Sequence, residues 1–90
     1  MKITKITSHV LGYDLPETLG YSQQYYKKRT SHIVEVETDE GITGWGECFG
    51  PGNIAFANKG IVEKVIQPIV LGMQALDRDV IWHKVYNLML

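Results

Sequence analysis

Hydrophobic and polar residues alternate in the first half of this chain. Between Thr30 and Thr38 valines alternate with glutamates, a period of two that predicts a half-buried strand. Gly41 follows where a short hairpin connection needs a positive φ, and a further strand is predicted from Ile42 to Cys48. The mixture of β-branched and polar residues from Lys2 to Leu15 predicts a first strand that ends at Pro16. The pattern therefore predicts an antiparallel sheet.

The spacing of the apolar residues becomes helical after the third predicted strand. Pro68 should end the first helix at about Gln67 or shortly after it, because proline has no backbone N–H to donate. A second helix is predicted after Asp77, a preferred N-cap residue. This order predicts an α+β fold, a three-stranded antiparallel meander followed by helices packed on it. The apolar positions are Ile61, Val62, Val65, Ile66 and Ile69 in the first helix and Ile81, Trp82, Val85, Tyr86, Leu88 and Met89 in the second.

Two segments have the composition of loops. The first, Glu17 to Arg29, is rich in tyrosine and cations and is longer than a simple connection requires. The second follows Cys48 and contains glycine and proline over residues 49–53. On the strand before it, Gly44 and Gly46 lie on one face, which predicts that something packs close to that backbone.

Composition limits the kinds of partner. The chain has 90 residues and a formal net charge of −1, and its cations are scattered apart from a short run at residues 27–29. We therefore expect neither nucleic acid nor a membrane as a partner. The apolar runs are too short to cross a bilayer, and Cys48 is the only cysteine, so no internal disulfide can form. We expect a soluble, cytoplasmic protein.

Several motifs, taken in order, carry a resemblance to a known family. The chain opens with M-K-I-T-K-I, continues with V-E-V-E-T-D-E-G and G-W-G-E, and has I-W-H-K-V-Y from Ile81 to Tyr86. It resembles the N-terminal domain of the enolase superfamily, in the mandelate racemase and muconate lactonizing enzyme branch, over essentially its whole length. Within that branch the run that ends in G-W-G-E-C is similar to sugar-acid dehydratases and sugar-lactone cycloisomerases.

The resemblance implies that residues 1–90 form a single N-terminal capping domain, a piece of a larger two-domain enzyme. A C-terminal β/α barrel, absent from these residues, would carry the base and the Mg²⁺ ligands that act on the proton α to a carboxylate. Racemisation, elimination and cycloisomerisation all remain open, as does the identity of the acid. We expect no catalytic residue, metal ligand or turnover in these residues alone. The implied partners are a small carboxylate substrate, the chain's own barrel and further copies in a homo-oligomer.

The resemblance also assigns substrate specificity to two loops, which map to Leu19–Arg29 and Cys48–Ile54. Tyrosine faces and cations suit a polyhydroxy acid, although a solvated loop explains any one of these residues equally well. Arg29 is favoured, because it lies where the loop re-enters the sheet. The candidate specificity residues are Tyr21, Tyr25, Tyr26, Lys28 and Arg29, with Phe49 as an apolar wall of the pocket.

Glu47 and Cys48 also admit a catalytic interpretation. A carboxylate at a strand end could act as a general base, but a glutamate after Gly-Trp-Gly is favoured as a loop anchor that accepts backbone N–H bonds. Cys48 could act as a nucleophile only beside His32, which shares a face with the strand valines and is favoured as a sheet histidine. His9 and His83 have no partner that the sequence identifies, so they do not predict a metal site.

Two other functions compete with that of a capping domain. An autonomous small binding module would use the tyrosine-rich loop 19–29 to hold a ligand, and it would need a complete core. A stand-alone enzyme using Glu47 or Cys48 would need a pocket that a domain of this size rarely forms. The capping-domain hypothesis predicts instead that the chain, if it folds alone, self-associates through the apolar surface that the barrel would cover.

Overall fold

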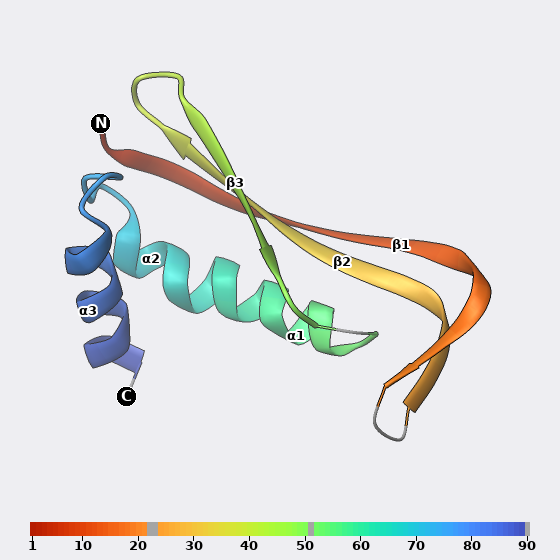
Figure 1. Ribbon diagram of the computed structural model, residues 1–90. Helices are drawn as coiled ribbons and strands as arrows, with labels where there is room; N and C mark the ends of the chain where they lie inside the picture. The colour runs from red at the N-terminus through yellow and green to blue at the C-terminus, as the bar shows by residue number, and fades with distance from the viewer. Residues whose placement is uncertain (22–23, 51, 90) are drawn as a thin grey trace.

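A computed structural model describes the backbone at residues 1–21, 24–50 and 52–89, and the side chains of that part outside residues 13–29. Its sheet contains three antiparallel strands in the order β1-β2-β3, namely β1 (Ile3–Tyr21), β2 (Gln24–Thr38) and β3 (Thr43–Cys48) (Figure 1). Gly41 in the turn before β3 has a φ of 78°, the positive value that the turn requires. The predicted meander is confirmed.

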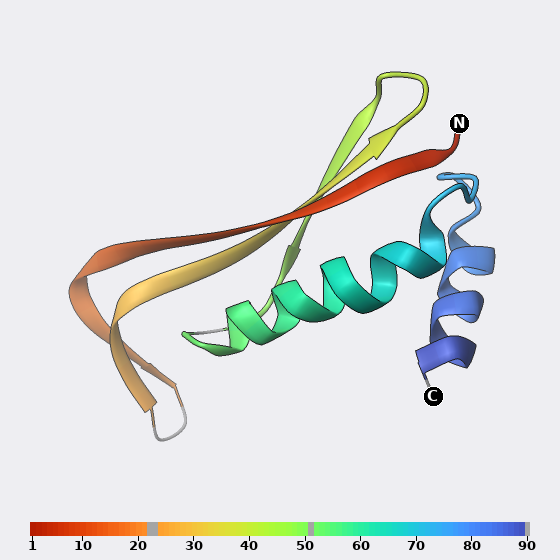
Figure 2. The ribbon, with the colours of Figure 1, turned by 180° about the vertical axis from the view of Figure 1, so that it is seen from behind.

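The helices lie over one face of this sheet, as Figure 2 shows from behind. α1 (Ile54–Gly60), the π-helical segment η1 (Ile61–Ile66) and α2 (Gln67–Val70) follow one another without a break, and α3 (Arg78–Met89) comes after a turn. α3 packs on α2, at the opposite end of the helical layer from α1. The centre of the core lies between β1 and the first helical stretch, and it consists of Ile3, Ile6, Val62 and Val70. The predicted α+β class is confirmed.

The first helix passes through Pro68 and ends at Val70, three residues beyond the Gln67 at or shortly after which the sequence predicted its end. η1 is π-helical, and the Gln67 N–H donates to the carbonyl of Val62, five residues back. Pro68 then falls in the first turn of α2, where a missing N–H is tolerated. The chain leaves the helix at Leu71, where ψ is 131°. The altered hydrogen-bond pattern before the proline thus allows the helix to continue.

β1 passes through Pro16, and the loop predicted from Glu17 to Arg29 is wrong at the level of the backbone, because these residues belong mainly to the paired strands β1 and β2. Their register shifts between Asp14 and Leu19. Pro16 falls inside that shift on an edge strand, where no neighbouring strand needs its N–H. In Figures 1 and 2 this part of the hairpin extends beyond the helices. Because no helix covers it there, neither face of the hairpin needs a regular alternation of apolar and polar residues.

Polar side chains of the helices hold the N-terminal half of β1. The Ile6 N–H donates to Gln67 Oε1 at 2.6 Å, and the Ser8 N–H donates to Glu63 Oε2 at 2.9 Å. Lys59 Nζ donates to the Ser8 carbonyl at 3.0 Å. The three side chains are four residues apart, which places them on one side of the helix. This junction fixes the helix against the sheet.

Acid should weaken this junction through Glu63. The hydrogen bond from the Ser8 N–H, and after it the Lys59 ammonium, hold the pKa of the Glu63 carboxyl below its ordinary value. A carboxyl with a lowered folded-state pKa contributes stability above its unfolded-state pKa, and the contribution is lost as pH falls through the folded value. We therefore expect the free energy of urea unfolding to fall between about pH 5 and about pH 3, and Glu63→Gln to flatten this decline. Glu37→Gln, on the other face of the sheet, is the control, and a decline unchanged in Glu63→Gln would contradict the assignment.

Candidate functional site

The two segments assigned to substrate specificity lie at the same end of the molecule, away from α3 (Figures 1 and 2). The first is a hairpin, in which Gly20 pairs with Tyr25 and Tyr13 pairs with Arg29. The side chains of all five candidates in this hairpin lie outside the described residues, so their roles stay predictions. They are Tyr21, Tyr25, Tyr26, Lys28 and Arg29.

The second segment is fastened to α1. Asn58 Nδ2 donates to the carbonyl of Phe49 at 3.0 Å, while the Phe49 side chain is 81% exposed. Phe49 therefore projects from a fixed backbone position, and its role as a pocket wall stays a prediction. Asn58 is not among the candidates from the sequence. The sequence feature that could have identified Asn58 is an asparagine, a weak helix former, within a short helix. In such a place a side-chain hydrogen bond often competes with helical bonding.

Gly50 supplies the tight contact in this segment. A Cβ added to Gly50 would lie 2.9 Å from Asn58 Nδ2 and 3.2 Å from the backbone nitrogen of Ala55. We expect Gly50→Ala to lower the free energy of unfolding by about 1–2 kcal/mol, because the added methyl group forces the segment away from α1. The matched control is Gly46→Ala, whose Cβ meets no described atom within 4 Å and which should change the free energy by less than about 0.5 kcal/mol. Equal losses in a urea titration of the two variants would contradict this account.

His32 is a buried sheet histidine, as the sequence favoured. His32 and Cys48 are paired in the register of β2 and β3. However, His32 Nε2 lies 2.8 Å from Ser8 Oγ, and Nδ1 has no hydrogen-bond partner among the described residues. The side chain is fully buried. No hydrogen bond joins His32 to Cys48 among the described residues, and the Cys–His nucleophile stays an untested hypothesis.

The sheet face away from the helices carries a second polar group. His9 Nε2 lies 2.9 Å from Glu35 Oε1, and the ring centroids of His9 and Trp45 are 6.1 Å apart. Glu47 is exposed near the end of β3, in register with Ile33. The anchoring role predicted for Glu47 stays a prediction.

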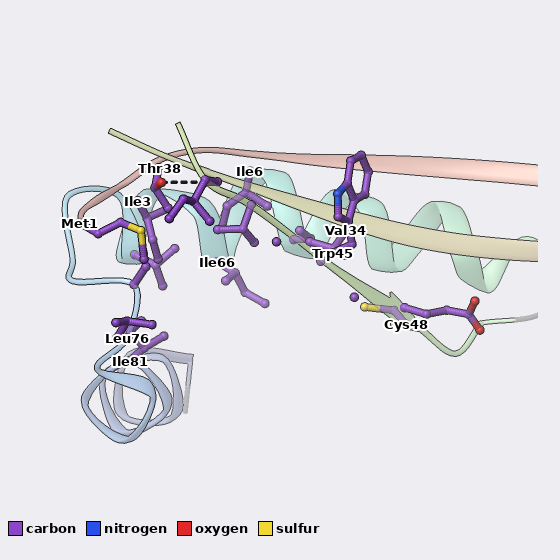
Figure 3. Close-up of a pocket in the computed structure, with 18 residues that line it drawn as sticks. Met1, Ile3, Ile6, Val34, Thr38, Trp45, Cys48, Ile66, Leu76 and Ile81 are labelled. Carbon is purple, nitrogen blue, oxygen red and sulfur yellow. Dashed lines mark hydrogen bonds between the residues drawn. The ribbon is translucent and has the colours of Figure 1, made fainter. Parts of the chain in front are cut away.

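An apolar groove of about 630 Å³ opens between the helix-facing side of the sheet and α3 (Figure 3). Gly44 and Gly46 lie along it, and a Cβ added to either would meet no described atom within 4 Å. The sequence predicted close packing against this backbone, and the described part of the chain does not supply it. Side chains from three strands and two helices line the groove, among them Ile3, Ile6, Val34, Val36, Ile66 and Ile81.

The residues described by the structure offer no ligand set for a metal ion. Across that part of the chain, no three histidine, cysteine, aspartate or glutamate side chains come together as a possible site. Its helices are also too short or too polar for any one of them to cross a membrane.

An antiparallel meander with helices on one face and two connecting segments at one end defines a small α+β domain. Residues 6–90 match the family described as the mandelate racemase / muconate lactonizing enzyme, N-terminal domain. The chain belongs to this family, within the enolase superfamily.

Two relatives match nearly the whole chain. The D-galactarolactone cycloisomerase of Agrobacterium fabrum (strain C58 / ATCC 33970) is 32% identical over 87 residues, which are 97% of this chain and 22% of that protein. The structure of a member of the enolase superfamily from Polaromonas sp. JS666 is 40% identical, with a TM-score of 0.86, over 97% of this chain and 23% of that one.

Two further structures contain ligands. A protein assigned to the mandelate racemase/muconate lactonizing enzyme group, from Roseovarius nubinhibens ISM, was solved complexed with magnesium; it is 30% identical, with a TM-score of 0.80, over 98% of this chain and 25% of its own. A protein assigned as a mandelate racemase from Bordetella bronchiseptica RB50 was solved complexed with 2-oxoglutarate/phosphate; it is 34% identical, with a TM-score of 0.82, over 96% of this chain and 23% of its own. The chain thus spans 22–25% of the length of these four proteins.

Proposed function

We propose that this chain is the substrate-specificity domain of a Mg²⁺-dependent enzyme that removes the proton α to the carboxylate of a sugar acid or related acid. The reaction would be a dehydration, a racemisation or a cycloisomerisation. The observation that carries the proposal is the match of 97% of the chain to a D-galactarolactone cycloisomerase. Because the match covers 22% of that relative, we assign the base and the metal ligands to a barrel in the remainder of the enzyme. We place this enzyme in the cytoplasm as a homo-oligomer.

In this proposal the β1–β2 hairpin and the second segment close over the substrate. A sugar acid offers a carboxylate and hydroxyl groups, which cations and tyrosine side chains bind. Strand pairing with Tyr13 fixes the backbone of Arg29, and the Arg29 guanidinium is the proposed carboxylate ligand. Phe49, held at its carbonyl by Asn58, forms an apolar wall. Further contacts are assigned to Tyr21, Tyr25, Tyr26 and Lys28.

Magnesium, when bound, stabilises the negative charge that develops on the substrate as the α proton leaves. The described residues of this chain do not fit such an ion, so we assign no step of the chain to it. The work of the chain is to bind and orient the acid and to exclude water from it.

The test uses the complete reading frame that contains this chain. The purified enzyme is incubated in D₂O with Mg²⁺ and a panel of sugar acids and lactones, D-galactarolactone included, and the α proton is followed by ¹H NMR. We expect loss or exchange of that proton with at least one compound, and EDTA should stop it. The 90-residue chain alone should show none. Turnover by the 90-residue chain, or exchange that survives EDTA, would overturn the proposal.

Arg29→Ala in the complete enzyme should raise KM about tenfold or more, because the substrate loses a charge-assisted hydrogen bond. The KM of Arg29→Lys should lie between those of Arg29→Ala and the parent enzyme, since lysine keeps the charge without the planar fork. Lys84→Ala, at the opposite end of the domain on α3, is the control. Steady-state kinetics in which Arg29→Ala and Lys84→Ala behave alike would remove Arg29 from the site.

The autonomous binding module remains the alternative. It needs a complete core, whereas the groove beside Gly44 and Gly46 leaves apolar side chains uncovered within the described part of the chain. A monomeric 90-residue chain that binds a ligand through its hairpin would favour the module.

A further inference from the structure

The backbone that carries Phe49 is held from two sides. On the strand side, the preceding residue Cys48 is paired with the fully buried His32 in the register of β2 and β3. On the helix side, Asn58 Nδ2 donates to the Phe49 carbonyl at 3.0 Å, and a Cβ added to Gly50 would lie 2.9 Å from the same nitrogen. The end of β3 and the start of α1 therefore meet in a tight contact (Figure 1).

α1 is itself fastened to the sheet, so Asn58 has a fixed position. The next residue, Lys59, donates from Nζ to the Ser8 carbonyl at 3.0 Å. Ser8 also contacts His32, whose Nε2 lies 2.8 Å from Ser8 Oγ. One connected set of contacts thus runs from the sheet through α1 to the Phe49 carbonyl.

This anchored backbone carries a side chain that makes little contact with the rest of the chain. Phe49 is 81% exposed, more than any other large apolar side chain in the described part of the chain. An aromatic ring stabilises a fold by being buried, and this ring contributes little burial. The hydrogen bond below it instead fixes where the ring projects, as the supporting residues of a binding site do.

We propose that Asn58 is the positioning residue of the second segment, and that it sets the discrimination between acids by fixing the Phe49 ring against the substrate. The inference rests on the proposed function. The second segment is then preorganised and does not need to be ordered by the substrate. The ring presents a flat apolar face, which suits a C–H face of a sugar acid. It rejects an epimer whose hydroxyl group points at the ring, because that hydroxyl loses water and gains no partner.

The kinetic experiment uses the complete enzyme and two acids of the panel that differ only in configuration at one carbon. Asn58→Asp keeps the size of the side chain but replaces the donor with an acceptor. We expect it to raise KM for the preferred acid about five- to tenfold and to leave kcat within about twofold. The ratio of kcat/KM between the two acids should narrow by about the same factor as KM rises. Asn87→Asp, at an exposed asparagine on α3, is the matched control and should change neither KM nor the ratio.

A purely structural role for Asn58 predicts a different result. Loss of folded enzyme would lower kcat for both acids together and leave both KM values and the ratio unchanged. That result would overturn the proposal.

Phe49→Ala tests whether Asn58 acts through the ring. This variant alone should narrow the ratio about tenfold, because the wall that excludes the poorer acid is gone. Adding Asn58→Asp to it should narrow the ratio no further, since no ring is left to position. Additive changes in the ratio would show that Asn58 acts by another route and would overturn the proposal.

Limited proteolysis tests the anchoring without any turnover. Chymotrypsin cleaves after exposed aromatic residues where the backbone can open into the protease. Cleavage of the complete enzyme after Phe49, measured by mass spectrometry, should be about tenfold faster in Asn58→Asp than in the parent and unchanged in Asn87→Asp. Unchanged cleavage in Asn58→Asp would overturn the proposal. A parent enzyme that acts on no acid of the panel would overturn the proposed function instead, so the two failures are distinguishable.

Discussion

Ile6→Ala should lower the free energy of unfolding by about 3 kcal/mol. Ile6 is 7% exposed and lies in the core cluster with Ile3, Val62 and Val70. Truncation removes buried methyl groups and leaves a space that the sheet and helix cannot close, because helix side chains hold β1 in place. A domain of this length has a total stability of about 5–13 kcal/mol, so this single change removes a large part of it.

The control for this variant comes from the same strand. Leu11 on β1 is also aliphatic, but it is 55% exposed. Leu11→Ala should therefore change the free energy of unfolding by less than about 0.5 kcal/mol. Urea titrations of the two variants side by side measure the difference. Similar losses would mean that the core does not lie where the structure places it.

Ser8→Ala should lower the free energy of unfolding by about 2–3 kcal/mol, although it removes a single oxygen atom. Ser8 Oγ is the partner of His32 Nε2, and His32 Nδ1 already lacks a partner among the described residues. Without the hydroxyl, a fully buried imidazole keeps neither bond. A buried polar group left unpaired loses its interaction with water and receives nothing in return.

A double-mutant cycle separates this explanation from simple loss of packing. Ser8→Ala combined with His32→Phe replaces both polar partners with apolar groups, which is often close to neutral. We expect the loss of unfolding free energy in the double variant to be smaller than the sum of the two single losses by about 1 kcal/mol or more. Strict additivity of the three unfolding free energies would show that the hydrogen bond contributes nothing.

The sheet and the last helix could be predicted because local chemistry determines them. The alternation around Val34 and Val36 identifies the strand whose face the helices cover. Gly41 marks the turn through its positive φ, and the carbonyl of Asp77 accepts the first bond of α3, from the Ile81 N–H. In each case the signal lies within a few residues of the feature that it predicts.

The extended hairpin and the continuation of the first helix could not be predicted in this way. Both contain a proline, and a proline stops an element only where its N–H would have been needed. Pro16 lies on an edge strand within a register shift, and Pro68 lies in the first turn after a π-helical segment. Whether a neighbour needs the N–H depends on the surrounding fold, which the sequence pattern around the proline does not contain.

The roles of the candidate site residues stay predictions. Phe49 is exposed, as a residue that meets a ligand must be. The hydrogen bond from Asn58 and the crowding around Gly50 hold its backbone in place, and both involve residues that are several positions apart in the sequence. The close packing predicted at Gly44 and Gly46 is not supplied by the described part of the chain, where a Cβ added to either meets no atom within 4 Å.

The junction between helix and β1 also affects how the protein behaves in a crowded solution. An unpaired strand edge is a template on which a strand from another molecule can add, and such addition leads to aggregation. At Ile6 and Ser8 the positions that a foreign strand would use are already bound by Gln67, Glu63 and Lys59. The helix side chains thus occupy backbone groups that a fourth strand would otherwise bind, and they prevent strand addition at this edge for as long as the helix remains packed on β1. Any change that releases the helix would therefore expose the edge and raise the risk of fibril formation in the same event.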